Sequence, residues 1–382
     1  MNNSFNVKFE VEEDPLRILL DYSGYTIIKN RRIHQLVSFA FLSCQLVMIL
    51  AGIFYGFLSK EKLKPFILGI IFHFPSDAAF FTSVVYGHDV NEYKHMVFEN
   101  CSCIDSGGPV IEKKIKNEIG WVMRLCFIPL FLSILMTISF LPFVGDEEIF
   151  LFQITIMKEW FGNWLVGLRF FVYLIFALLL GISGWIVGST TIVTGYIIFH
   201  LKFQFILLDR HFEKLKSLVR EKNEDIRQQE VRNGLKNFVE NHLRIKNLYK
   251  LLFRRQDFYM IILTPPLILA VVAFVYFIKT EISPPSNFRM LIGLVTGAVT
   301  FCSHCINGQL LSDESSKLHE KLYSCDWIDW NESNKKSMMI ILPAIKEPMK
   351  ASCLGLVDLG HPYILFVSRA IYSLLAVAVT LL

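Results

Sequence analysis

Seven apolar stretches, each long enough to cross a bilayer, constrain this chain more than any other feature. A membrane-spanning helix needs about 20 mostly apolar residues. The sequence has seven such stretches, at 33–58, 65–87, 121–143, 165–200, 257–279, 288–311 and 355–382. Apolar residues make up 53% of its 382 residues and charged residues 19%, so a soluble fold would leave much apolar area in water. We therefore predict an all-α, polytopic protein of the lipid bilayer with seven transmembrane helices.

The distribution of basic residues predicts the orientation of these spans, because loops rich in Lys and Arg stay in the cytosol. The segments on one side of the spans carry 29 Lys and Arg, whereas those on the other side carry five. We expect the N-terminus inside and, because the number of spans is odd, the C-terminus outside. This is the reverse of a G-protein-coupled receptor, so seven spans alone do not indicate a rhodopsin-like protein.

The spans divide the chain into six expected segments. These are a cytosolic N-terminal segment at 1–32, spans one to four at 33–200, a cytosolic helical extension at 201–256, spans five and six at 257–311, a cytosolic anchor helix in 312–354, and a last span at 355–382. The fourth apolar stretch is too long for one crossing. We expect its helix to continue into the cytosol through Phe203, Phe205, Leu207 and Leu208.

Two of the cytosolic segments have an apolar face. The first shows a heptad-like seam, made of Val231, Leu235, Phe238, His242, Ile245, Tyr249 and Leu252. The second runs from Lys335 to Met349, and Pro343 and Pro348 limit its length. Neither can bury its apolar face alone, so we predict a cytosolic anchor layer that mediates oligomerisation; the alternative is a helix on the lipid surface. His242 is interpreted as a seam histidine rather than a pH sensor.

No motif indicates an enzyme, a cofactor or a metal site. The chain lacks a Gly-rich phosphate loop, a GxSxG elbow, an HExxH motif and a TVGYG filter. The stretch 302–305 offers a single Cys/His group, whereas a structural zinc site needs about four ligands, so helix packing is the better interpretation. A net charge of +4 does not indicate a nucleic-acid partner.

The C-terminal part of the chain carries an ordered set of short motifs. They are Gly308-Gln309-Leu310-Leu311, Asp313-Glu314-Ser315, Leu318, Tyr323, Trp327, Lys335-Lys336, Lys346-Glu347-Pro348 and the run from Ser368 to Leu375. In order and spacing this set resembles the C-terminal signature of the insect odorant receptor family. Related gustatory receptors typically carry Thr-Tyr and a terminal Gln-Phe in the last helix, and the co-receptor subunit has an extended fourth loop; this chain has neither. It resembles a divergent, ligand-tuned odorant receptor subunit.

The resemblance implies a function and an assembly. Such a subunit is an odorant-gated, non-selective cation channel subunit in the plasma membrane of olfactory sensory neurons. It forms a heterotetramer with the co-receptor around one pore, lines that pore with its last helix, and binds a small volatile organic ligand among the outer halves of spans two to six. The alternatives are a receptor that signals through a cytosolic partner, a gustatory-type receptor channel, and a small-solute transporter.

The last span supplies the candidate gate. Tyr372, Leu375, Val379 and Leu382 recur at a spacing of three or four and share one helical face. A ring of apolar side chains closes a pore by dewetting; the alternative is that this face packs against other spans. Arg369 lies deeper, where it either lines a cytosolic vestibule or pairs with an acidic group such as Asp358, which we assign to the inner end of the last span.

A volatile ligand needs an apolar cage with few polar anchors. The outer halves of spans two to five supply the candidates, which are Gly69, Phe72, His73, Ser133, Met136, Thr137, Phe140, Tyr173, Phe176, Phe274 and Tyr276. Aromatic rings give shape-tolerant contact and methionine adapts to the ligand outline. His73 is the best candidate for an anchoring hydrogen bond. For each residue the alternative is ordinary helix packing.

Overall fold

The computed structural model describes six long segments of the chain, 108–139, 169–218, 224–279, 284–325, 327–353 and 357–380, together with Gly162 and scattered residues between 16 and 101. Its elements are the helices α5 (Pro109–Ser139), α7 (Arg169–Leu218), α8 (Glu224–Lys279), α9 (Pro284–Tyr323), α10 (Glu332–Ile345) and α11 (His361–Thr380), the 3-10 turn η5 (Trp327–Asp329), and the two-residue strands β1 (Ser352–Cys353) and β2 (Val357–Asp358). The described chain is mostly helical, as predicted.

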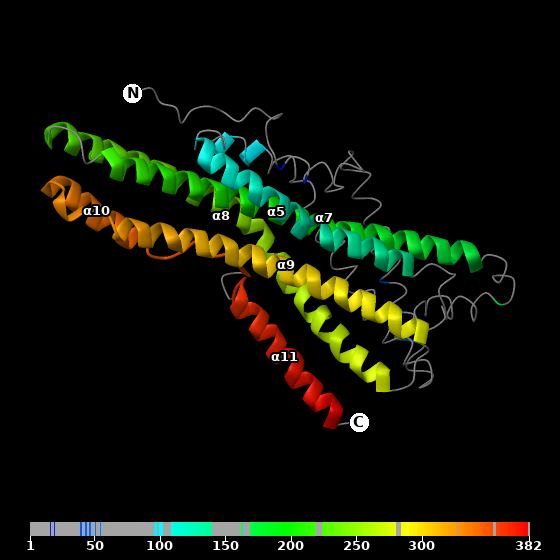
Figure 1. Ribbon diagram of the computed structural model, residues 1–382. Coiled ribbons are helices and arrows are strands. Elements are labelled where there is room, and N and C mark those ends of the chain that lie inside the picture. Colours follow the sequence, from blue (N-terminus) through cyan, green and yellow to red (C-terminus); the bar gives the residue numbers. More distant parts are fainter. Residues whose placement is uncertain are drawn as a thin grey trace.

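Three helices are much longer than a bilayer crossing requires. At 50, 56 and 40 residues, α7, α8 and α9 extend for about 75, 84 and 60 Å, against about 30 Å of hydrocarbon core. Their long axes dominate the molecule (Figure 1). The predicted continuation of the fourth span through Phe203 and Leu208 is confirmed, because α7 runs without a break to Leu218. The segment boundaries expected at 256 and 311 also fall inside continuous helices.

Apolar helices of membrane-spanning length are present among the described residues. Pro109–Ser139, Gly188–Arg210 and Phe288–Tyr323 are long and apolar enough to cross a bilayer, and His361–Val377 is a shorter apolar helix. Of the first predicted span only single residues are described, and the second lies outside the described residues. Within Gly188–Arg210, 94% of the most apolar window of 18 residues is buried inside the chain. The middle of α7 therefore runs through the core rather than along the surface.

The core forms where α5, α8 and α9 surround α7. Tyr196, Phe199 and Phe203 of α7 are fully buried there. Glycines let α5 approach closely, because a Cβ added at Gly184 would lie 3.2 Å from the Cβ of Ser133. Gly181 and Gly188 make similar approaches to α5. The glycines of α7 thus determine where the two helices approach most closely, and which residues of α5 are buried against α7.

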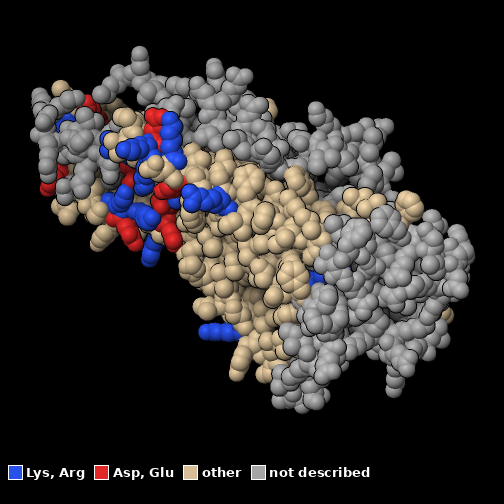
Figure 2. Space-filling model, turned by 45° about the vertical axis from the view of Figure 1, so that its right-hand side comes forward, with Lys and Arg blue, Asp and Glu red and all other residues tan. Residues whose placement is uncertain are grey.

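Charged side chains gather mainly toward one end of the molecule on the face seen in Figure 2, and most of the other described surface there is uncharged. The same contrast exists along α8. Its N-terminal half exposes Lys236, Glu240 and Arg244, whereas the stretch 264–275 has no charged residue. A long helix that changes character in this way fits a protein that is partly in lipid and partly in water.

The predicted heptad seam is buried inside the chain. Val231, Leu235, Phe238 and Ile245 are each at most 5% exposed, and α8 contacts α7, α9 and α10. His242 lies beside the ring of Phe238, with 6.1 Å between ring centroids. Burial, together with the nearby positive charge of Lys246, lowers the pKa of His242 from 6.5 to about 4. The imidazole therefore stays neutral near pH 7, which favours the packed histidine over the pH sensor.

A buried amide cluster attaches α10 to the start of α8. The Nδ2 of Asn334, which is 1% exposed, donates to the backbone and side-chain oxygens of Gln228, both at 2.9 Å. The backbone N–H of Asn331 donates to the same side-chain oxygen at 2.9 Å. The Asn331 side chain in turn caps α10 by accepting from the Asn334 N–H. Three of these hydrogen bonds join the start of α10 to the start of α8.

Replacing Asn334 with leucine is expected to lower the unfolding temperature of the purified protein by about 5 °C, because both hydrogen bonds from its buried amide to Gln228 are lost, at a total cost of about 2 kcal/mol. Thermal unfolding in detergent measures this. Asn237→Leu is the control, since Asn237 lies on the exposed face of α8 and its replacement leaves no buried group unpaired. Equal unfolding temperatures for the two variants would contradict the structural role of the cluster.

Candidate functional site

The last helix, α11, starts from a short antiparallel hairpin. Strands β1 and β2 pair Ser352 with Asp358 and Cys353 with Val357. The Asp358 carboxylate forms an ion pair with the Nζ of Lys350 at 2.7 Å. Helix α11 begins only at His361, so the assignment of Asp358 to the inner end of the last span is wrong; Asp358 lies in β2, before the helix. The structure pairs it with Lys350 rather than with Arg369.

Helix α9 holds this start of α11 through Gly308 and Gln309. Gly308 is so close to the turn before α11 that an added Cβ would lie 2.5 Å from the backbone oxygen of Leu359. The side-chain Oε1 of Gln309 accepts the backbone N–H of His361 at 3.2 Å. Its Nε2 donates to Asp313 at 2.7 Å, which orients the amide. A side chain of α9 thus satisfies one of the free N–H groups at the N-terminus of α11.

Helix α8 holds the first turn of α11 through a buried pair of hydroxyls. The hydroxyl oxygens of Thr264 and Tyr363 are 2.8 Å apart, and the two residues are 5% and 4% exposed. The Thr264 hydroxyl donates its one hydrogen to the backbone oxygen of Met260 at 2.7 Å. The Tyr363 hydroxyl is therefore the donor in the pair and Thr264 the acceptor.

Helix α11 is packed by one face only among the described residues. Tyr363 and Val367 are buried against α8 and α9, and α11 runs away from α9 beside the C-terminal half of α8 (Figure 1). Ile364, Ile371 and Leu375 are half-buried. Five further apolar side chains are more than 40% exposed; these are Leu365, Phe366, Tyr372, Leu374 and Val377. An apolar helix with a wide uncovered apolar face requires lipid or another subunit to cover it.

The predicted gate residues lie partly on this uncovered side. Tyr372 is 75% exposed, Arg369 is exposed and Leu375 is half-buried. Val379 belongs to α11, but its side chain is outside the described set, and Leu382 lies beyond the described residues. The gate role of the set stays a prediction.

The predicted ligand-binding residues are described only in part. Ser133 is buried against Gly184 of α7, and the Thr137 side chain contacts Gly181. Both hydroxyls donate to carbonyls of their own helix, at 2.8 and 2.9 Å. Met136 and Phe274 are half-buried. Tyr173, Phe176 and Tyr276 belong to α7 and α8 with side chains outside the described set, and Gly69, Phe72, His73 and Phe140 lie outside the described residues. Their ligand-binding role stays a prediction.

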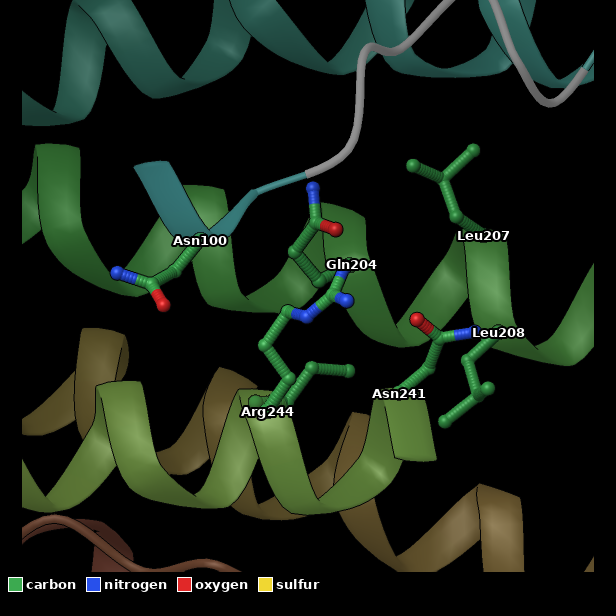
Figure 3. A pocket seen from close by; sticks show the side chains of 7 residues that line it. Asn100, Gln204, Leu207, Leu208, Asn241 and Arg244 are labelled. Carbon is green, nitrogen blue, oxygen red and sulfur yellow. The ribbon is translucent and has the colours of Figure 1, made fainter. Parts of the chain in front are cut away.

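A small polar cleft opens between α7 and α8, away from α11. It has about 260 Å³ of empty space, part of which is open to solvent, and is lined by Asn100, Gln204, Leu207, Leu208, Asn241, Arg244 and Ile245 (Figure 3). Two of its amides serve their own helices, because Asn100 donates to the Met96 carbonyl and Asn241 to the Asn237 carbonyl. A cage for a volatile ligand is mostly apolar. This cleft therefore does not match the expected ligand site.

The sequence interpretation missed several of these residues. Arg289 is 1% exposed, and its Nε donates to the backbone oxygen of Ser139 at 2.8 Å, which links the ends of α9 and α5. A lone arginine at the edge of the apolar stretch 288–311 is the signal that could have identified it. Thr264 and Tyr363 carry no such signal, because hydroxyl residues are common in helices and their pairing depends on tertiary structure alone.

These features define a helical membrane protein whose last apolar helix is fixed at its base and leaves one apolar face uncovered. The family model described as 7tm Odorant receptor matches residues 109–361. The chain belongs to this odorant receptor family, which confirms the resemblance seen in its C-terminal motifs.

Two solved structures of the insect olfactory receptor OR5 from Machilis hrabei are similar to this chain in fold. The one in complex with eugenol has a TM-score of 0.67 at 14% identity and covers 96% of this chain and 97% of its own. The other has a TM-score of 0.64 at 13% identity and covers 98% of this chain and 94% of its own. No curated protein sequence matches the chain significantly. The likeness therefore extends over nearly the whole length of both chains.

Proposed function

We propose that this protein is an odorant-gated, non-selective cation channel subunit of the plasma membrane. In this proposal the chain crosses the bilayer seven times, with its N-terminus inside and its C-terminus outside. It assembles with the co-receptor into a heterotetramer around one pore. A small volatile organic ligand binds in the outer transmembrane region among the candidates named above, including Met136 and Phe274.

The observation that carries the proposal is the uncovered apolar face of α11. Its exposed side chains include Leu365, Tyr372 and Val377, so the helix is suited to line a pore on one side and to contact neighbouring subunits. Its base is attached to α8 and α9. These two helices contain spans five and six, from which we expect part of the ligand cage. A displacement of α8 or α9 by a ligand therefore reaches α11 directly.

Expression in cells that lack odorant receptors, with and without the co-receptor, tests the proposal. We expect a volatile panel to evoke cation currents within milliseconds when the co-receptor is present, without added G proteins. The panel includes eugenol, because a similar receptor was solved in complex with it. Substitutions at Val379 are expected to alter the relative permeability of cations. Responses that appear only with an added G protein, or a permeability set by the co-receptor alone, would contradict the proposal.

A further inference from the structure

Helix α8 contains a built-in weak point within the region that contacts α11, between Thr264 and Leu267. Pro265 and Pro266 have no backbone N–H, so the carbonyls of Ile261 and Ile262 lack their helical donors. The helix continues through this point, and α8 changes direction along its length (Figure 1). Consecutive prolines are an established cause of bends in helices. Movement within α8 is therefore expected to concentrate here.

The residue next to this weak point is the one that holds α11. Thr264 directly precedes Pro265, and its hydroxyl receives the hydroxyl hydrogen of Tyr363 at 2.8 Å. Because Thr264 also donates to Met260, its oxygen is fixed in direction relative to the N-terminal side of the bend. A displacement at the bend therefore moves the acceptor that Tyr363 needs.

On the α11 side, Tyr363 is firmly held. It is the third residue of α11, and its ring lies 5.5 Å from that of Phe301 in α9 and 6.2 Å from that of Phe366, measured between centroids. A buried tyrosine hydroxyl that loses its acceptor is costly, so Tyr363 follows Thr264 or forces a rearrangement. Tyr363 and its neighbours belong to the apolar cluster that joins α8, α9 and α11.

We infer that the Thr264–Tyr363 hydrogen bond is the link through which movement at the proline pair of α8 displaces α11, so that Tyr363 is a positioning residue for channel opening. The inference rests on the proposed function, because it assigns a coupling role within the same channel. It differs from a stability role in a way that can be measured. If the bond serves only stability, a variant is affected only when one hydroxyl stays buried without the other. If the bond transmits movement to α11, ligand sensitivity falls in every variant that lacks the bond.

The test is a double-mutant cycle of Thr264→Val and Tyr363→Phe, with both half-maximal ligand concentration and unfolding temperature measured. T264V removes the Thr264 oxygen that accepts from the buried Tyr363 hydroxyl and is expected to lower the unfolding temperature. Y363F leaves the Thr264–Met260 bond intact and is expected to change it little. The double variant leaves no unpaired hydroxyl, so its stability is expected to return close to wild type.

The half-maximal concentration is expected to behave differently from stability. It should rise about tenfold in T264V, in Y363F and also in the stable double variant, a coupling loss of the usual size between two sites. Thr264→Ser keeps the hydroxyl and is expected to stay within about twofold of wild type. Thr300→Val is the matched control, because this buried hydroxyl of α9 donates only to its own helix and should leave the concentration unchanged.

The inference is overturned if Y363F and the double variant respond at the wild-type concentration, because sensitivity then follows stability alone. If the wild-type protein passes no current with or without the co-receptor, the proposed function fails instead. The link is then judged by hydrogen–deuterium exchange over residues 361–367, with purified full-length protein. Exchange about tenfold faster in Y363F supports the link, and exchange equal to wild type overturns it.

Discussion

Replacing Gly308 with valine is expected to abolish ligand-evoked current and to lower the unfolding temperature by about 6 °C or more. The added Cβ would lie 2.5 Å from the Leu359 oxygen, 2.9 Å from the Leu359 Cβ and 3.1 Å from the Leu359 carbonyl carbon. Two of these atoms belong to the backbone, so the clash cannot be relieved by a side-chain rotation. Either α9 or the turn before α11 has to move, at a cost of about 3 kcal/mol.

Loss of current in this variant is expected to exceed what its loss of stability explains. The displaced turn contains Gly360, whose own approach to the Gln309 side chain is equally close, and it leads directly into His361. Moving it breaks the Gln309–His361 hydrogen bond and shifts the axis of α11. Whole-cell current is therefore to be normalised to the amount of receptor at the cell surface, measured by labelling.

Two other glycines provide matched controls for Gly308. Gly297 is also on α9, but an added Cβ there meets only the Cδ1 of Leu267 at 3.0 Å, the far end of a flexible side chain. Gly120 on α5 has no atom within 4 Å of an added Cβ. Gly297→Ala and Gly120→Ala are expected to keep wild-type current. A Gly308→Val variant with normal current per surface receptor would contradict the importance of this contact.

The helical architecture was predictable from periodicity and length. Apolar residues continue past the fourth span to Leu208, and α7 continues with them. The heptad spacing of Val231, Leu235 and Phe238 predicted a packed face, and that face is buried. Such patterns are local, because a helix repeats every 3.6 residues and the spacing of its apolar residues shows which side is buried.

The base of α11 was not predictable in the same way. Gly308 and Gln309 were noted as part of a motif, but nothing in their spacing says that they meet Leu359 and His361, about 50 residues later. The hairpin of β1 and β2 has only two residues a strand, which is too short for an alternating pattern to appear. The Thr264–Tyr363 bond joins positions 99 residues apart. Contacts of this kind arise only when distant helices pack.

The partners of ion pairs could not be predicted from the sequence either. Counting basic residues by segment predicts which side of the bilayer they occupy, but it does not reveal which of them is buried. Lys202 is one of many basic residues after the fourth span, yet it is 7% exposed. Its Nζ lies 2.6 Å from a carboxylate oxygen of Glu118, and 5.9 Å above the centroid of the Phe199 ring. This partly buried pair joins α7 to α5 at the edge of the core.

Replacing Lys202 with methionine is expected to destabilise the protein by about 3 kcal/mol, the cost usual for removing one partner of a buried ion pair. The Glu118 side chain is 28% exposed, so its carboxylate keeps only part of its hydration once the ammonium group is gone. Thermal unfolding in detergent measures the effect, which corresponds to a fall of about 6 °C or more. Lys236→Met is the control, because the Lys236–Glu240 pair is 3.9 Å long and both side chains are largely exposed, where a pair contributes less than about 1 kcal/mol.

The double variant Lys202→Met with Glu118→Leu separates two contributions to stability. One is the attraction between Lys202 and Glu118, and the other is the cost of leaving the Glu118 carboxylate unpaired. If the single variant is unstable chiefly because Glu118 is left without a partner, removing that carboxylate as well should restore most of the lost stability, since apolar replacement of a buried pair is often neutral. A double variant no more stable than K202M would mean that the pair itself, together with the contact to Phe199, holds α7 against α5. A single variant as stable as K236M would contradict the buried position of the pair.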